Sequence, residues 1–161
     1  MPTPAELEAK LWKTLKSDMT VMLGLSKSER GHTRPMTAQI EGEHGPIWFF
    51  ASRDTEIVKA LSQGKPAAFS LVSKGHDLFA SVEGKLSVDM DREVIARLWN
   101  GFIAAWFEQG EDDPNLALLR FDPEHAEIWE NANNLLASIK ILFGVDPKQD
   151  YKDNVAEVSF S

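Results

Sequence analysis

The residues between 34 and 55 include side chains suited to binding a phosphate. Arg34 supplies a guanidinium, Ser52 and Thr55 supply hydroxyls, and a short helix is predicted to begin at Thr55. A guanidinium pairs with phosphate through two parallel hydrogen bonds, and the N–H groups of a helix N-terminus favour an anion. This pattern predicts an anion site. In a simpler alternative, Arg34 is a surface charge and the two hydroxyls only cap the helix.

Two predicted strands and this helix would position these groups. Residues 36–41 alternate between apolar and polar types, and residues 47–51 form an apolar run after a Gly-Pro turn, which favours two strands. Residues 55–62 then have apolar side chains at helical spacing. If the two strands pair antiparallel, they bring Arg34 and Thr55 to the same end of a sheet.

The rest of the chain predicts a single, mainly β domain over residues 1–161. About six antiparallel strands are expected in all, the further ones at residues 19–25, 67–72, 78–88 and 116–129. Gly84 lies inside the most regular of them and indicates a bulge or a close approach by another backbone. An open sheet of this size would leave edges, whereas closure into a barrel removes them.

Helices are expected to flank the sheet. An N-terminal helix is predicted at about residues 5–16, and a C-terminal helix with a tail at about 134–161. Asp91 is suited to cap a further helix, whose broad apolar face is predicted to run from Val94 to Trp106 with a break near Gly101.

Composition argues against several classes of partner. The chain has 161 residues, 17 of them basic and 25 acidic, and its net charge of −8 disfavours nucleic acid and anionic membrane surfaces. No run approaches the ~20 apolar residues that cross a bilayer, and the chain is expected to be cytoplasmic. It has no cysteine, and its four histidines lack the spacing of a metal site. We therefore expect no metal, nucleic-acid or membrane partner.

The order of these parts resembles the FMN-binding split barrel of the pyridoxamine 5'-phosphate oxidase-like proteins, in particular the general stress protein branch. The resemblance extends over roughly residues 7–145, and its first motifs are Arg34-Pro35-Met36, Trp48-Phe49-Phe50 and Thr55. It implies a six-stranded antiparallel split β-barrel with flanking helices. It also implies a homodimer that binds FMN, or FAD, in the clefts between its subunits.

The resemblance also implies which residues would contact the flavin. Its phosphate would bind to Arg34, Ser52 and Thr55, and its ring would lie along Pro35, Met36, Thr37, Phe50 and Ala51. Trp106 and Trp129 are further aromatic candidates, with Trp129 contributed by the partner subunit. The family often has Thr at the position of Ala51 and Lys at that of Ile57. Lys59 is a substitute for that lysine two residues further on, and both departures predict weakened FMN binding.

The resemblance leaves the activity open. True pyridoxamine phosphate oxidases bind the substrate's phosphate with Arg and His, where this chain has no cation in residues 131–135, so we do not expect that reaction. No residue is assigned as a general acid or base, and a stress-related oxidoreductase or flavin carrier would rely on the flavin itself. The alternatives are a non-catalytic stress protein that has lost the flavin, and a haem or tetrapyrrole binder with His32 or His125 as axial ligand.

Overall fold

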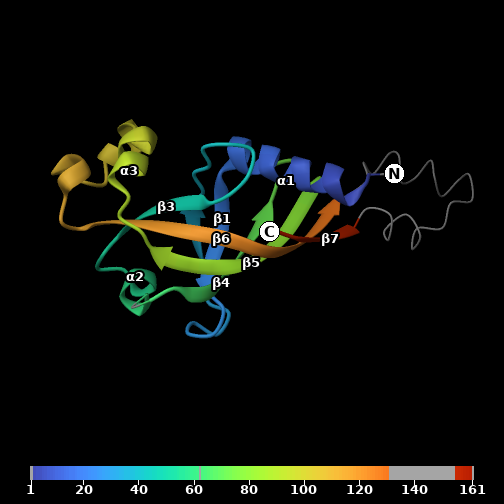
Figure 1. The fold of residues 1–161 in the computed structure, drawn as a ribbon, viewed down its shortest axis with the longest axis horizontal. Coiled ribbons are helices and arrows are strands. Elements are labelled where there is room, and N and C mark those ends of the chain that lie inside the picture. The colour runs from blue at the N-terminus through green and yellow to red at the C-terminus, as the bar shows by residue number, and fades with distance from the viewer. Residues whose placement is uncertain (1, 62, 131–154, 161) are drawn as a thin grey trace, which may run out of the picture.

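The computed structural model describes residues 2–61, 63–130 and 155–160. Its strands are β1 (Thr20–Leu25), β2 (Arg34–Thr37), β3 (Ile47–Ser52), β4 (Lys65–Val72), β5 (Leu78–Val88), β6 (Leu116–Glu130) and β7 (Val155–Ser159). Its helices are α1 (Pro4–Asp18), α2 (Glu56–Ala60), α3 (Arg92–Leu98) and α4 (Gly101–Ala104), followed by the 3-10 turn η1 (Gly110–Asp112). This is the mainly β architecture with flanking helices that the sequence predicts (Figure 1).

The strands form one antiparallel sheet whose two ends come together. The order is β2-β1-β4-β5-β6-β3, and β7 pairs with β6 outside this path. An isolated bridge joins Gln39 to Trp48, with two backbone hydrogen bonds of 2.8 Å, and so connects the segment after β2 to β3. The six strands β1 to β6 are those expected from the sequence. The seventh, β7, lies within the predicted tail, and the helix predicted before it lies outside the described residues.

The predicted pairing of the two strands around residues 36–41 and 47–51 is wrong. β2 ends at Thr37 and pairs with β1, whereas β3 pairs with β6, so the two strands meet only at the Gln39–Trp48 bridge. β2 and β3 are the first and last strands in the order of the sheet, so they meet only where the sheet closes on itself, at this bridge. The same closure still places β2 and β3 next to each other.

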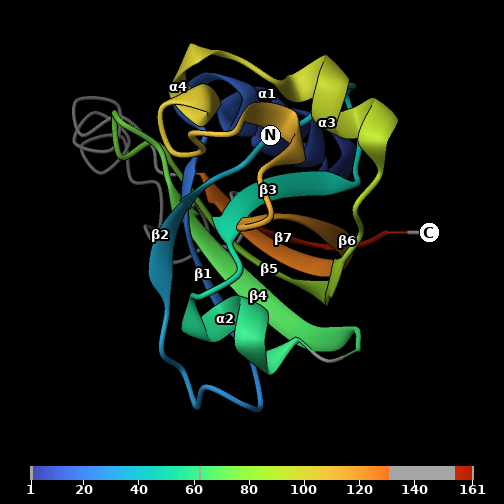
Figure 2. The ribbon, with the colours of Figure 1, turned by 90° about the vertical axis from the view of Figure 1, so that its left-hand side faces the viewer.

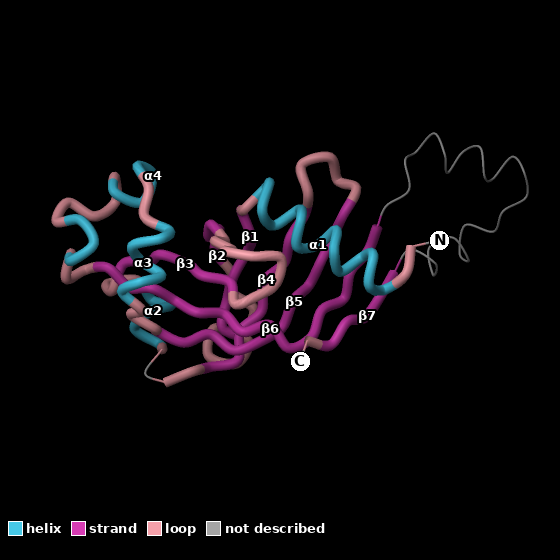
Figure 3. Tube along the Cα trace, turned by 45° about the horizontal axis from the view of Figure 1, so that its top comes forward, coloured by secondary structure: helices cyan, strands magenta, loops and turns pink. Residues whose placement is uncertain are grey.

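Two groups of buried side chains hold the helices on the barrel. Leu7, Leu11 and Leu15 of α1 are at most 1% exposed and belong to the main core, which fills the barrel. A second cluster joins Val94 and Ile103, from α3 and α4, to buried residues of β3 and β6. α1 therefore covers one side of the barrel, and α3 and α4 gather beyond β3 (Figures 2 and 3). No described helix is long and apolar enough to cross a membrane.

The predicted helix from Asp91 begins and breaks as expected. The Asp91 side chain accepts hydrogen bonds from the N–H groups of Glu93 and Val94, and the helix is interrupted before Gly101. The single apolar face predicted from Val94 to Trp106 is wrong beyond the break, however, because Phe102 is 87% and Trp106 79% exposed. The break changes the direction of the chain, so residues on either side of it no longer share one face.

Gly84 lies at an irregularity in the pairing of β5 with β6, as the sequence predicts. A Cβ at this position would lie 2.2 Å from the carbonyl oxygen of Asp122 and 2.9 Å from Cζ of Phe121. Gly84→Ala is therefore expected to lower the free energy of unfolding by about 1–3 kcal/mol, measured by urea denaturation. Gly42→Ala is the control, because a Cβ there meets no atom within 4 Å. Equal losses in the two variants would contradict the packing argument.

Candidate functional site

Two contiguous hollows lie where β2 and β3 come together. The first, here the polar hollow, has a volume of about 650 Å³ and includes Arg34 and Thr55. The second, here called the apolar hollow for the aromatic side chains in its wall, has a volume of about 800 Å³ and extends to Phe102 and Trp106 beside α4; Gln39 and Asn100 also line it. Met36, Phe50 and Ala51 border both hollows. Each volume is within the range of roughly 300–1,000 Å³ typical of small-molecule sites.

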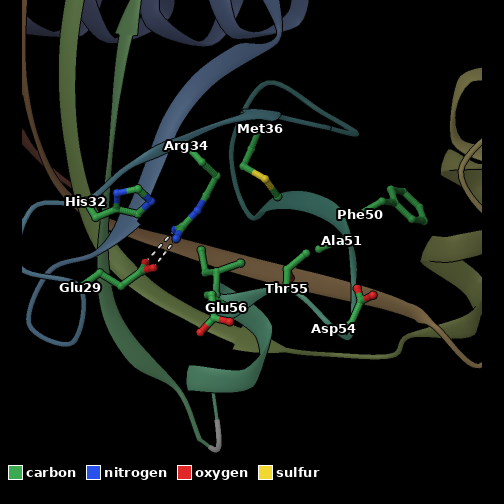
Figure 4. Close-up of a pocket in the computed structure, with 10 residues that line it drawn as sticks. Glu29, His32, Arg34, Met36, Phe50, Ala51, Asp54, Thr55 and Glu56 are labelled. Atoms are coloured by element: carbon green, nitrogen blue, oxygen red, sulfur yellow. Dashed lines mark hydrogen bonds and ion pairs between the residues drawn. The ribbon is translucent and has the colours of Figure 1, made fainter.

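The structure brings most of the predicted flavin residues to these hollows. Met36 projects from β2 toward Ala51, and Arg34, also from β2, turns toward Glu29 at the other side of the polar hollow (Figure 4). The other predicted residues in the two walls are Pro35, Thr37, Phe50, Ser52, Thr55 and Trp106.

Two predicted residues line neither hollow. Lys59 is exposed on α2, and Trp129 is half-buried on β6, opposite Phe79 of β5 and Val155 of β7. Lys59 therefore does not take the place of the lysine that the family often has at the position of Ile57, as far as the hollows of its own chain are concerned. The contact expected of Trp129 involves a second copy of the chain and stays a prediction.

Glu29, which is not among the predicted site residues, binds the guanidinium of Arg34. Its carboxylate accepts hydrogen bonds from both terminal nitrogens of Arg34, the Nη1–Oε1 distance being 2.7 Å. Oε1 also accepts from the N–H of Leu25 at 2.9 Å, and Nη1 donates to the Leu23 carbonyl at 3.2 Å. Glu29 is the only acidic residue in the connection between β1 and β2, which is the one signal that points to it. Arg34 is thus held by a carboxylate inside the predicted phosphate site.

The ion pair also fixes the charge state of Glu29. Hydrogen bonding to Arg34 lowers the pKa of Glu29 below its ordinary value of 4.5, and burial opposes this effect without reversing it. The Leu25 N–H and the electrostatic effects of Arg34 and His32 lower this pKa further. Glu29 is therefore ionised at neutral pH, and its charge balances that of Arg34.

The lowered pKa of Glu29 predicts a loss of stability in acid. A group whose pKa falls on folding contributes stability above its unfolded pKa, here about 4.5, and the contribution disappears as pH falls through the folded value. Wild type should therefore be more stable than Glu29→Gln at pH 7, and the difference should shrink at pH 3. Urea denaturation at both pH values measures this difference. An equal difference at the two pH values would contradict the assignment.

Thr55 and α2 form the opposite wall of the polar hollow. The helix is shorter than the predicted 55–62, and Thr55 makes no side-chain cap to it; its hydroxyl donates to the Ser52 carbonyl at 2.6 Å. The capping alternative is therefore wrong for Thr55. The first N–H groups of α2 have no acceptor within the helix. Asp54 and Glu56 lie beside them, so this wall also carries negative charge.

The polar hollow is acidic overall, yet it does not have the geometry of a metal site. Glu29, Asp54 and Glu56 line it together with the cation Arg34 and with His32. Within the described ranges, no three His, Asp or Glu side chains come together as a metal-ligand group. Because Arg34 is paired with one carboxylate and two more carboxylates line the hollow, a phosphate entering it would meet both attraction and repulsion.

The apolar hollow offers aromatic and aliphatic surface. Phe50 contacts Trp99 edge to face, with ring centroids 6.1 Å apart, and Trp99 in turn lies 6.3 Å from Phe107. Phe102 and Trp106 stand exposed at the edge of the hollow. Such a surface, next to a polar hollow, fits a flat ring that carries a charged or hydrogen-bonding tail.

Comparison with known proteins identifies the relatives of this chain. Residues 6–151 match the model of the family described as pyridoxamine 5'-phosphate oxidase like. General stress protein 26 of Bacillus subtilis is 28% identical over 65 residues, which are 40% of this chain and 46% of that protein. The match thus spans less than half the length of this curated relative.

Solved structures of general stress proteins share the fold. One from Xanthomonas campestris pv. campestris is 57% identical, with a TM-score of 0.78 over 83% of this chain and 93% of that one. The general stress FMN/FAD binding protein of Xanthomonas citri is 56% identical, with a TM-score of 0.76 over 81% of this chain and 92% of that one. A general stress protein 26 from a Jannaschia species is 28% identical, with a TM-score of 0.80 over 98% and 100% of the two chains.

Proposed function

Because this chain belongs to the pyridoxamine 5'-phosphate oxidase-like family, we propose that it is a stress-related flavoprotein that binds FMN, or FAD, in the two joined hollows. One observation carries the proposal: Arg34 on β2 and Thr55, in the turn between β3 and α2, line one polar hollow that continues into an apolar one. The relative from Xanthomonas citri, 56% identical, is an FMN/FAD binding protein, which supports the choice of ligand.

The residues present fit a flavin in part. Arg34 would hold the phosphate together with the Thr55 hydroxyl, which must first turn away from the Ser52 carbonyl, while Met36 and Phe50 would contact the ring. A bound flavin would supply electron or hydride transfer, and the chain would supply binding, orientation and electrostatics.

Two positions in the polar hollow weaken the fit. Ile57 is 2% and Ala51 8% exposed, and neither side chain can donate a hydrogen bond to the flavin. A missing hydrogen bond to a charged group costs about 1.5–3 kcal/mol, or one to two factors of ten in affinity. We therefore expect FMN affinity in the micromolar range rather than a permanently bound flavin.

The proposal includes a homodimer with the flavin at the subunit interface. Phe102 and Trp106 are among the most exposed large apolar side chains described, and both border the apolar hollow. Exposed aromatic side chains of this kind are enriched in protein interfaces. A second copy covering them would enclose the flavin ring, and Trp129 of that copy is the proposed further contact.

Spectroscopy of the purified protein tests the proposal. Flavin absorption bands, or quenching of FMN fluorescence at micromolar protein, would support it. A Soret band would instead indicate a tetrapyrrole site, for which His32 in the polar hollow and His125 on β6 are the axial candidates. A colourless protein that does not bind FMN at high micromolar concentration would rule the proposal out and favour a non-catalytic stress protein.

Reduction experiments separate an oxidoreductase from a flavin carrier. We propose that pyridoxamine phosphate is not the substrate; residues 131–135, on which that expectation depends, lie outside the described residues. Anaerobic bleaching of the bound flavin by NADH or NADPH would show that the protein accepts electrons from a nicotinamide. Unchanged flavin bands with both donors would favour a carrier.

A further inference from the structure

We infer that Glu29 competes with the ligand's phosphate for Arg34, and so determines how strongly the polar hollow distinguishes a phosphorylated flavin from an uncharged one. This inference rests on the proposed function, since it concerns the same site. It adds a specificity-determining residue that comes from the connection between β1 and β2 and that belongs to none of the motifs described above.

The geometry gives Glu29 the place that a phosphate would take. Both terminal nitrogens of Arg34 donate to its carboxylate, in the two-point arrangement in which a guanidinium also binds phosphate. The pair is largely sheltered, because the side chain of Glu29 is 12% and that of Arg34 20% exposed. Two backbone groups of β1 fix the position of the pair: the Leu25 N–H donates to Glu29, and the Leu23 carbonyl accepts from Arg34.

The surrounding charges add to the competition. Figure 4 shows Glu56 and Asp54 across the hollow from Arg34, while His32 lies on the side of Glu29. A dianionic phosphate must therefore exchange with one carboxylate at Arg34 while it approaches two others. When a phosphate replaces Glu29 at Arg34, the net gain in binding free energy is only the difference between two similar ionic interactions. An uncharged ribityl chain needs no such exchange.

Two substitutions separate competition at Arg34 from the general charge of the hollow. Glu29→Gln removes the competing charge at nearly constant shape, whereas Glu56→Gln removes a charge from the same hollow without touching Arg34. Titrations with FMN and with riboflavin, followed by flavin fluorescence, give the affinities. Glu29→Gln should tighten FMN binding by about tenfold or more and change riboflavin binding less than about twofold. Glu56→Gln should have a clearly smaller effect on FMN.

Removal of Arg34 supplies a second comparison. In an Arg34→Ala background, Glu29→Gln should tighten FMN binding by less than about threefold, because the contested partner is gone. Urea denaturation and circular dichroism confirm that each variant is folded.

The outcomes distinguish this inference from the proposed function. If wild type binds FMN but Glu29→Gln binds it equally or more weakly, Glu29 is not a competitor and only this inference fails. The same holds if Glu56→Gln tightens FMN binding as much as Glu29→Gln. If no folded variant binds FMN or riboflavin, the proposed function fails and this inference fails with it.

Discussion

Arg34→Ala is expected to weaken FMN binding by about tenfold, because the phosphate loses its guanidinium but no longer has to displace Glu29 from it. The variant loses hydrogen bonds between charged groups, each contributing about 1.5–3 kcal/mol. It also leaves the carboxylate of Glu29 in the polar hollow without its partner. Fluorescence titration measures the loss. Riboflavin, which has no phosphate, should lose less than about threefold.

Arg92→Ala is the matched control for this prediction. Arg92 is an arginine paired with an acidic residue, Asp112, but its side chain is 63% exposed and lies outside both hollows. Its removal should leave FMN binding unchanged. Arg34→Ala should also lower the free energy of unfolding by about 1–3 kcal/mol, because a sheltered carboxylate is left unpaired. Equal FMN affinities in the two variants would show that Arg34 does not bind the phosphate.

Joint substitution of Phe102 and Trp106 by alanine is expected to weaken the proposed homodimer by about thirtyfold or more. Aromatic side chains at the centre of an interface can contribute about 1 kcal/mol or more each, and Phe102 and Trp106 are 87% and 79% exposed in the single chain. Sedimentation velocity over a concentration series measures the dimer dissociation constant. Because the second copy is proposed to complete the flavin site, FMN affinity should fall in parallel.

Val72→Ala provides the control for the dimer prediction. Val72 is also an exposed apolar residue, 50% exposed at the end of β4, but it borders neither hollow. Its substitution should change neither the dimer nor FMN binding. A protein that sediments as a monomer at every concentration, in wild type as in the variants, would contradict the proposed interface.

Local patterns were enough to place individual elements. Strict alternation predicts β5 at residues 78–88, and the structure has it at Leu78–Val88. Asp91 and Gly101 mark the start of one helix and the break after it, because capping and interruption depend on neighbouring residues alone. Gly84 likewise predicts the irregular pairing with β6, because a glycine inside a strand often marks a place where another backbone comes close.

Features that depend on the closed sheet could not be read from these patterns. The sequence indicates that β2 and β3 are strands, but not that they pair with β1 and β6 and meet only at one bridge. The Glu29–Arg34 pair depends on how the connection after β1 folds back, which no periodicity encodes. The exposure of Phe102 and Trp106 follows from a change in chain direction at Gly101, whereas a continuous helical spacing would bury them.

A crystal structure of the protein with FMN tests the central claim most directly. We expect the phosphate within hydrogen-bonding distance of Arg34 and Thr55, with Glu29 displaced from the guanidinium. We expect the flavin ring to lie against Met36 and Phe50, between two copies of the chain. A flavin bound elsewhere, or a phosphate distant from Arg34 while Glu29 remains paired with it, would contradict the account.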